Sequence, residues 1–203
     1  MSERHSIEVS LSEIAAHSGL NSALVKYYFG NKDGLLLALV EREAAAALRD
    51  LRLLLDLDLS PTEKLKKHIA AIINNFFRRP YLNRLLHSFL GERPSRTKCA
   101  AHVRRIFVKP LLELQSELLA QGVKAGEFKP IDPVLFYVSL LGACDHLFNA
   151  RYVLRGMKNG SLNDSLRTRY VEHVCDVFVN GVANSVARSP TLSLRRRASR
   201  LLI

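Results

Sequence analysis

Few residues in this chain are spaced for covalent catalysis. Cys144, Asp145 and His146 place a nucleophile, an acid and a base side by side in the sequence. Consecutive residues of a helix point about 100° apart, however, and cannot converge on one substrate. The motifs H-E-x-x-H, G-x-S-x-G, G-x-G-x-x-G and the Walker lysine loop are all absent. We therefore expect no catalytic residues, no cofactor and no enzyme activity.

Metal and disulfide chemistry are also poorly supported. His146 and His173 could approach one another across two packed helices, but the pattern offers no third ligand. Cys99, Cys144 and Cys175 are widely spaced and form no C-x-x-C pair, which is typical of reduced thiols that pack like small apolar side chains. We expect no metal site.

Residues 10–35 indicate recognition chemistry instead. On the second of two short predicted helices, a hydroxyl, a methyl, an ammonium and a phenol share the exposed face, in Ser22, Ala23, Lys26 and Tyr27. Such a mixture suits a few contacts to DNA base edges, flanked by anchors on the phosphates. We expect Ser22 and Ala23 nearest the bases. Lys26, Tyr27 and Lys32 are better placed to hold phosphates.

Caps and turns predict the elements that position these residues. Ser10 and Glu13 form an S-x-x-E capping box, and Gly19 suits the left-handed end of the first helix. Asn21 is a good cap for the second helix, and Gly30 ends it. Two helices joined by a tight glycine turn form a helix-turn-helix, whose second helix lies in the major groove. Ordinary helical hairpins share this pattern.

Apolar spacing completes the predicted head, residues 1–55. Leu24, Val25 and Tyr28 are expected to pack inward. A third helix begins after Asn31 and carries apolar residues at helical spacing as far as Leu55. The full set of candidate DNA-binding residues is Ser10, Ser22, Ala23, Lys26, Tyr27, Tyr28 and Lys32.

The residue order of this segment resembles the N-terminal domain of TetR-family transcriptional repressors, whose second and third helices read T-x-x-I-A-x-x-A-G-V-S-x-x-x-L-Y-x-Y-F-x-S-K-x-x-L. The chain matches this pattern in register at Ser10, Ile14, Ala15, Gly19, Leu20, Asn21, Val25, Tyr28, Phe29, Asn31, Lys32 and Leu35. The family places a further helix ahead of this pair, and the residues MSERHSIEV are too few and too polar to replace it. Either translation starts upstream, which is the simpler explanation, or the head is shortened and binds DNA weakly.

Composition agrees with a regulator of this kind. The chain has 203 residues, 48% of them apolar, and a formal net charge of +11. The charge excess lies outside the head, because residues 1–55 hold six basic and seven acidic residues. Charge therefore supports DNA binding only weakly. No signal peptide is visible, and the longest apolar run, 134–144, is too short to span a bilayer. We expect a cytoplasmic protein without membrane contact.

The remainder of the chain is predicted to be helical, at about 62–78, 81–90, 97–122, 132–154 and 163–188, with Pro110 kinking or dividing the third helix. Residues 56–188 are expected to form a second domain, and residues 189–203 a basic, mobile tail. The helices at 132–154 and 163–188 are apolar over more than one stripe, which a buried core pair would also explain. The TetR resemblance implies that they form the interface of a homodimer.

Aromatic and polar side chains of the middle helices could line a pocket for a small-molecule effector, although each could equally be a core residue. The candidates are Phe76, Phe77, Tyr81, His87, Phe89, His102, Phe107, Phe136, Tyr137 and Phe148. We interpret the chain as an all-α, ligand-responsive repressor that acts as a homodimer on a palindromic operator. The alternative is a dimeric ligand-binding or partner-binding protein with impaired DNA binding, and an α-helical enzyme is a more distant one.

Overall fold

The computed structural model describes residues 10–19, 21–91, 97–149, 154 and 162–184. Over these residues the chain is all-α, as predicted, with helices close to the expected positions. Several sequence-based expectations lie outside the described residues: those for residues 1–9, for Leu20, for the part of the last helix beyond residue 184 and for the tail 189–203.

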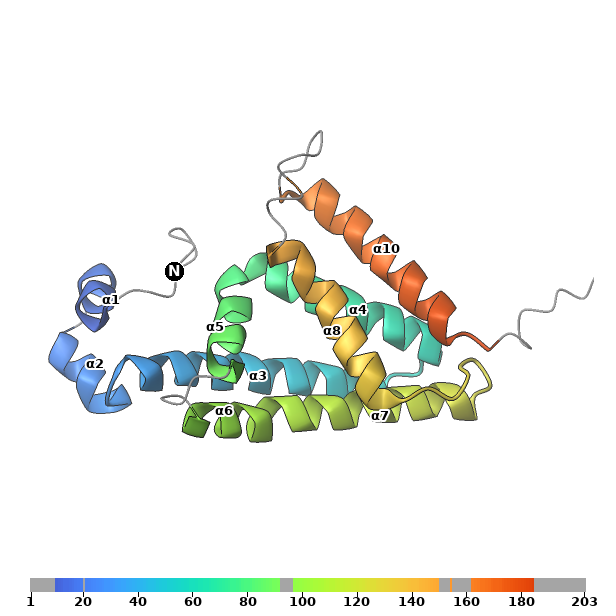
Figure 1. The fold of residues 1–203 in the computed structure, drawn as a ribbon, viewed down its shortest axis with the longest axis horizontal. Coiled ribbons are helices and arrows are strands. Elements are labelled where there is room, and N and C mark those ends of the chain that lie inside the picture. The colour runs from blue at the N-terminus through green and yellow to red at the C-terminus, as the bar shows by residue number, and fades with distance from the viewer. Residues whose placement is uncertain (1–9, 20, 92–96, 150–153, 155–161, 185–203) are drawn as a thin grey trace, which may run out of the picture.

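Two short helices and one long helix form the N-terminal part. Helices α1 (Leu11–Ser18) and α2 (Ser22–Phe29) lie at one end of the molecule, and α3 (Lys32–Asp56) leads from them into the body (Figure 1). Helices α1 and α2 contribute one buried residue each, Ala15 and Val25. Helices α1 and α2 are therefore held to the rest of the molecule mainly through α3.

The body is a layered helical bundle. Its elements are α4 (Pro61–Arg78), α5 (Pro80–Leu90), α6 (Thr97–Val103), a π-helical segment (Arg104–Val108), α7 (Lys109–Lys124), α8 (Pro133–Asn149) and α10 (Asp164–Val182). Helices α6 and α7 run alongside α3, while α8 and α10 pack on α4 (Figure 1). One continuous hydrophobic core extends from Leu36 on α3 to Val182 on α10, so α3 belongs to both the head and the body.

The predicted helix 97–122 is divided at Pro110, as expected. Proline has no backbone N–H, and its ring would clash with the carbonyl four residues earlier. The helix widens to a π-helical turn just ahead of it, in which the Lys109 N–H bonds the Arg104 carbonyl. This insertion separates α6 from α7 without a change of direction.

The last helix ends earlier than predicted. Helix α10 stops at Val182, and Ala183 forms an isolated β-bridge with Phe128. The Val182 carbonyl accepts a hydrogen bond from the Lys129 N–H at 2.9 Å. In a longer helix this carbonyl would instead accept a hydrogen bond from an N–H further along α10, so the loop after α7 replaces the helical partner. The spacing of apolar residues along a helix does not reveal that its last residues will pair with the backbone of a distant loop, so the earlier end could not be predicted.

Candidate functional site

The helix-turn-helix of the head has the predicted caps. The Ser10 hydroxyl oxygen accepts a hydrogen bond from the Glu13 backbone N–H at 3.1 Å, and the Glu13 carboxylate accepts one from the Ser10 N–H at 2.7 Å. Gly19 has a φ of 70°, which glycine adopts without steric cost. Asn21 then caps α2 through its side-chain oxygen. These local contacts fix where α1 ends and where α2 begins.

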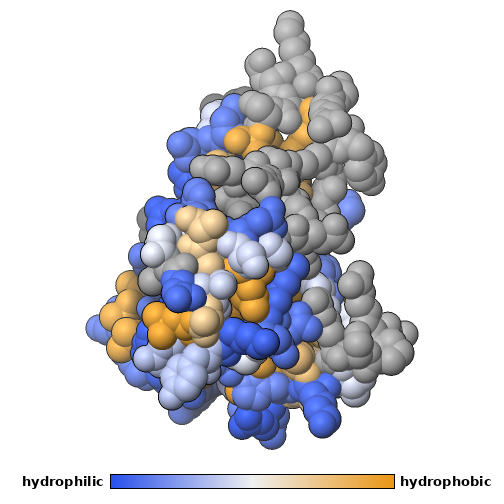
Figure 2. Space-filling model, turned by 90° about the vertical axis from the view of Figure 1, so that its left-hand side faces the viewer, coloured by the Kyte–Doolittle hydropathy of each residue, from blue (hydrophilic) through white to orange (hydrophobic). Residues whose placement is uncertain are grey.

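Helix α2 presents the predicted contact face to solvent. Ser22, Ala23, Lys26 and Tyr27 are all exposed, while Val25 on the opposite side is buried. A view onto this end of the molecule shows apolar and polar residues interspersed (Figure 2). The exposed face therefore offers the hydroxyl, methyl, ammonium and phenol groups together on one short helix.

Two residues of α2 do not pack inward, contrary to the prediction. The Leu24 side chain is 46% exposed and that of Tyr28 is 70% exposed. The main neighbours of α2 are α1 and α3, and they cover only the side that carries Val25. Tyr28 instead lies edge-on against Tyr27, with ring centroids 5.3 Å apart. The prediction assumed a wider packing face than these neighbours provide.

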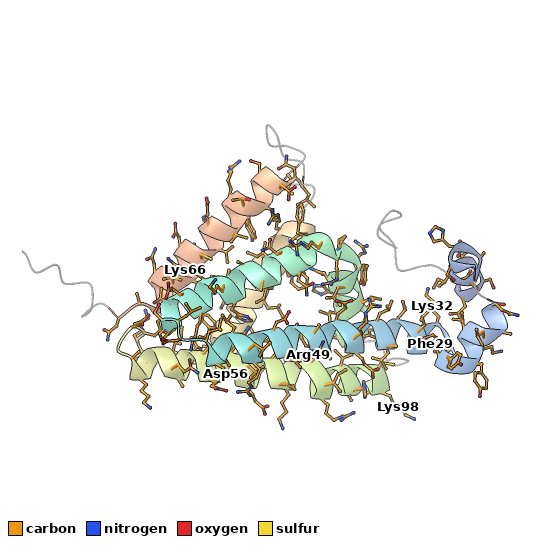
Figure 3. All side chains as sticks on the ribbon, turned by 180° about the vertical axis from the view of Figure 1, so that it is seen from behind. Phe29, Lys32, Arg49, Asp56, Lys66 and Lys98 are labelled. Carbon is orange, nitrogen blue, oxygen red and sulfur yellow. The ribbon has the colours of Figure 1, made fainter. Side chains whose placement is uncertain are left out.

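The corner between α2 and α3 is unusually tight. Gly30 has a φ of 71°, and Asn31 caps α3 by accepting a hydrogen bond from the Gly34 N–H at 2.9 Å. A Cβ atom on Gly34 would lie 2.0 Å from the Phe29 carbonyl oxygen. Lys32 sits in the first turn of α3 at this corner, close to Phe29 (Figure 3). The close approach of the two backbones sets the angle of α2 and requires glycine at position 34.

A second candidate site is a cavity of about 700 Å³ in the body. It is bordered by α3, α4, α5, α7, α8 and the π-helical segment, and its volume lies in the range of small-molecule sites. Its walls are largely apolar, with side chains such as Leu54, Ile72, Leu86, Leu111 and Leu141. Four of the predicted pocket residues line it: Phe76, His87, Phe107 and Tyr137.

The other six pocket candidates do not line this cavity. Five of them pack in the core or against neighbouring side chains: Phe77, Tyr81, Phe89, Phe136 and Phe148. The sixth, His102, is bound to α3, with its Nε2 2.6 Å from Glu41 Oε1. Aromatic side chains at helical spacing indicate burial, but the spacing does not tell which buried face borders a void.

One buried acid of the cavity wall was missed by the sequence analysis. Glu43 on α3 is only 6% exposed, and its carboxylate lies 2.8 Å from Arg42 Nη2 and 3.2 Å from Arg79 Nε. The hydrogen bond and charge of Glu43 raise the pKa of Arg42 above its ordinary value. The sequence does contain a signal for this residue, because Glu43 is an acidic residue within the apolar stripe of α3. The ion pair ties α3 to the junction of α4 and α5.

Two histidines of the cavity have different environments. His68 on α4 is buried, and burial lowers its pKa to about 4, so the ring is neutral at physiological pH. The side-chain nitrogen of Gln115 lies 2.8 Å from His68 Nε2. His87 is exposed, and its Nε2 lies 2.8 Å from Asp145 Oδ2 on α8.

Asn83 is a further cavity residue that the sequence analysis missed. It lies on α5 and is 2% exposed. Neither its amide nitrogen nor its amide oxygen has a hydrogen-bond partner among the residues that the structure describes. The signal in the sequence was an asparagine among leucines in PYLNRLLHSFL. Buried polar groups are paired in the great majority of cases, which makes this side chain unusual.

The Cys144–Asp145–His146 trio diverges, as helix geometry predicts. Cys144 is buried, and burial raises its pKa to about 12. Asp145 turns to the cavity and His87, while His146 is exposed. Among the described residues, no cluster of three His, Cys, Asp or Glu side chains could hold a metal ion. No helix in the described part of the chain is long and apolar enough to cross a membrane.

Helices α8 and α10 leave part of their apolar surface uncovered. Val134, Leu135 and Val138 on α8 and Val177 on α10 are all more than half exposed. The opposite faces of both helices, including Leu140 and Val174, are buried in the core. The two helices therefore contribute to the core and to the surface at once.

Family models match both parts of the chain. A model described as "Bacterial regulatory proteins, tetR family" matches residues 3–39, and one described as "Tetracyclin repressor-like, C-terminal domain" matches residues 58–187. The fold and the two matches define a helix-turn-helix transcriptional regulator. The chain belongs to the TetR family.

Individual relatives agree with this class. The HTH-type transcriptional regulator BetI of Brucella anthropi is 38% identical over 71 residues, which are 35% of this chain and 34% of that protein. The match thus spans about a third of the length of this curated relative.

Two solved structures share the fold. The fatty acid degradation regulator FadR from Bacillus halodurans superposes with a TM-score of 0.66 at 22% identity, over 86% of this chain and 89% of that one. FadR from Bacillus subtilis, solved in complex with stearoyl-CoA, has a TM-score of 0.67 at 19% identity, over the same shares of the two chains. At these identities the likeness shows the fold and not the ligand.

Proposed function

We propose that this TetR-family regulator is a ligand-responsive repressor that binds a palindromic operator as a homodimer. The observation that carries this proposal is the path of α3. Its first turn forms the tight corner with α2, and its later turns supply Glu43, Leu51 and Leu54 to the cavity wall. One continuous helix therefore joins the candidate DNA-binding face to the candidate effector site.

The exposed face of α2 supports DNA binding. Ser22 and Ala23, at the N-terminal end of the helix, are assigned to base edges, and Lys26 and Tyr27 to phosphates. Ser10, Tyr28 and Lys32 flank this face and complete the proposed contact set. The backbone N–H groups at the start of α3 add a partial positive charge near the DNA backbone.

The uncovered apolar faces of α8 and α10 support the homodimer. Leu135, Val138 and Val177 expose apolar surface that a second copy can bury, and burial of such surface is the main driving force of association. A two-fold axis through this interface would place two heads on two half-sites, about one helical turn of DNA apart or a multiple of it.

A ligand can release the protein from DNA if it binds the released form more tightly than the DNA-bound form. An effector that binds the released form 100-fold better than the DNA-bound form shifts the equilibrium by about 2.7 kcal/mol. The cavity is the proposed place for this effector. The solved FadR complex with stearoyl-CoA shows that a protein of this fold can hold a small molecule.

Operator binding tests the proposal directly. Fluorescence anisotropy would measure binding of the protein to the DNA upstream of its own gene, at two salt concentrations. Lys26→Ala combined with Tyr27→Ala is expected to abolish sequence-specific binding. The control Lys124→Ala removes an exposed lysine of the body that lies outside the wall of the 700 Å³ cavity, and it is expected to bind as wild type.

A salt-sensitive background without sequence preference would refute the repressor. The result would favour the alternative, a dimeric ligand-binding or partner-binding protein with impaired DNA binding. The few buried residues of α1 and α2 are the observation behind this alternative, because Ala15 and Val25 alone are buried in these two helices.

A further inference from the structure

Exposed basic side chains gather on α6 and the π-helical segment that follows it. Residues 97–109 hold four basic residues and no aspartate or glutamate. Three of the four, Lys98, Arg104 and Arg105, are exposed on this part of the body, and we call them the basic strip. The head differs, because its six basic and seven acidic residues leave it close to neutral. The strip therefore supplies positive charge that the head lacks.

The positive charge of the strip is available to a partner. Lys98 and Arg104 have no ion pair among the residues that the structure describes. Arg105 bonds the ring of His102, with its Nη2 3.1 Å from Nδ1, and a histidine ring carries no negative charge to neutralise it. The acid on the other side of that ring is Glu41 of α3, 2.6 Å from Nε2. One carboxylate thus faces a segment with three exposed cations.

Two contacts show which end of the strip is nearer the head. His102 on α6 lies against Glu41 on α3, and further along both helices Arg52 Nη1 lies 2.7 Å from Glu117 Oε2. Residue numbers rise together in the two pairs, so α6 and α7 run parallel to α3. Because α3 starts at the head, α6 also starts at that end of the molecule (Figure 1).

Lys98 is the part of the strip nearest the head. It lies one helical turn before His102, which is level with Glu41 on α3. Lys98 is therefore level with about residue 37 of α3, about 8 Å from Lys32 along the helix axis. Side chains of a helix lean toward its N-terminus, which here is the head end. Figure 3 shows Lys98 and Lys32 at the same end of the molecule.

We propose that the basic strip is a second contact surface for the operator, on which Lys98 holds a phosphate beside the one assigned to Lys32. The four-carbon stem of Lys98 spans about 6 Å, which covers most of the interval between the two residues. Arg104 and Arg105 lie further from the head and add attraction at longer range. The inference rests on the proposed function for the operator, but a phosphate contact requires no particular base sequence.

The salt dependence of DNA binding tests this surface. Fluorescence anisotropy would compare wild type and Lys98→Gln on two duplexes of equal length, one from upstream of the gene and one of unrelated sequence. Each phosphate contact adds about 0.9 to the slope of log affinity against log salt. Lys98→Gln removes two contacts from the proposed dimer, so the slope is expected to fall by about 1.8 on both duplexes. The affinity loss would then be about tenfold greater at 50 mM than at 200 mM salt.

Three matched variants separate a local contact from a general change in charge. Lys124→Gln removes an exposed lysine about 39 Å further along the same helical segment, and it should keep the wild-type slope. Lys98→Arg keeps the charge and should also keep the slope. Arg104→Gln, about 9 Å further from the head than Lys98, should lower the slope by less than Lys98→Gln. Lys98→Gln is expected to melt at the wild-type temperature, because its side chain is exposed.

The two duplexes distinguish this inference from the repressor itself. If wild type prefers the upstream duplex and Lys98→Gln keeps the wild-type slope, the inference is overturned and the repressor stands. An equal fall for Lys124→Gln would also overturn it, because net charge alone would then explain the effect. If wild type shows no preference but Lys98→Gln still lowers the slope, the phosphate contact stands and the repressor does not. Binding to neither duplex would overturn both.

Discussion

The buried imidazole of His68 makes a specific prediction about stability and pH. Burial lowers its pKa from 6.5 to about 4. Between these two values the unfolded chain takes up a proton that the folded chain does not, so the free energy of unfolding falls as the pH falls through this window. At 1.36 kcal/mol per pKa unit, the full loss is about 3 kcal/mol below pH 4, and about 2 kcal/mol is already lost at pH 5.

Urea unfolding of wild type and His68→Gln at pH 7.5 and pH 5, at one protein concentration, measures this loss. Other groups titrate in both proteins, so the difference between their pH effects isolates His68. The wild type is expected to lose about 2 kcal/mol more than His68→Gln between the two pH values. His173→Gln, which removes an exposed histidine, is the control and should retain the wild-type loss. Equal losses in wild type and His68→Gln would refute the reasoning.

Three further predictions concern the head, the cavity wall and the surface of the body. Gly34→Ala is expected to destabilise the protein by about 1–3 kcal/mol and weaken operator binding, because its Cβ meets the Phe29 carbonyl oxygen; Gly142→Ala, in open space, should not destabilise it in urea unfolding. Glu43→Ala is expected to cost about 1–3 kcal/mol in the same assay, because it removes the ion pairs of Glu43 with Arg42 and Arg79; the cost stays in this range because both arginines can return to water, and no loss would contradict the ion-pair assignment. Val138→Glu is expected to give a monomer in sedimentation velocity, whereas Val123→Glu on α7 should not; a dimeric Val138→Glu protein would exclude this face from the interface.

Local signals predicted the helices well. The Ser10 capping box, the positive φ of Gly19 and the interruption at Pro110 depend on a few neighbouring residues, and each appears where the sequence places it. Such features involve backbone groups within one or two turns of the residue concerned. The division of the chain into a head, a body and a tail remains a prediction.

Non-local packing accounts for the errors. Tyr28 was expected inside because it follows the apolar spacing of α2, but none of the helices that the structure describes covers it. Periodicity assigns a face to each residue, and the fold decides whether another element covers that face. The same reason explains why aromatic candidates such as Phe136 lie outside the cavity wall, while the polar residues Glu43 and Asn83 line it.

In the proposed mechanism, helix α3 also acts as a lever. From Leu55 back to Lys32 it is about 35 Å long at 1.5 Å per residue. A tilt of about 5° at the cavity would therefore carry its far end through about 3 Å. In the proposed dimer two such movements would change the separation of the heads by up to about 6 Å, which is large compared with the reach of a hydrogen bond to a base. In this proposed mechanism, an effector in the body would dislodge the heads from the DNA without touching them.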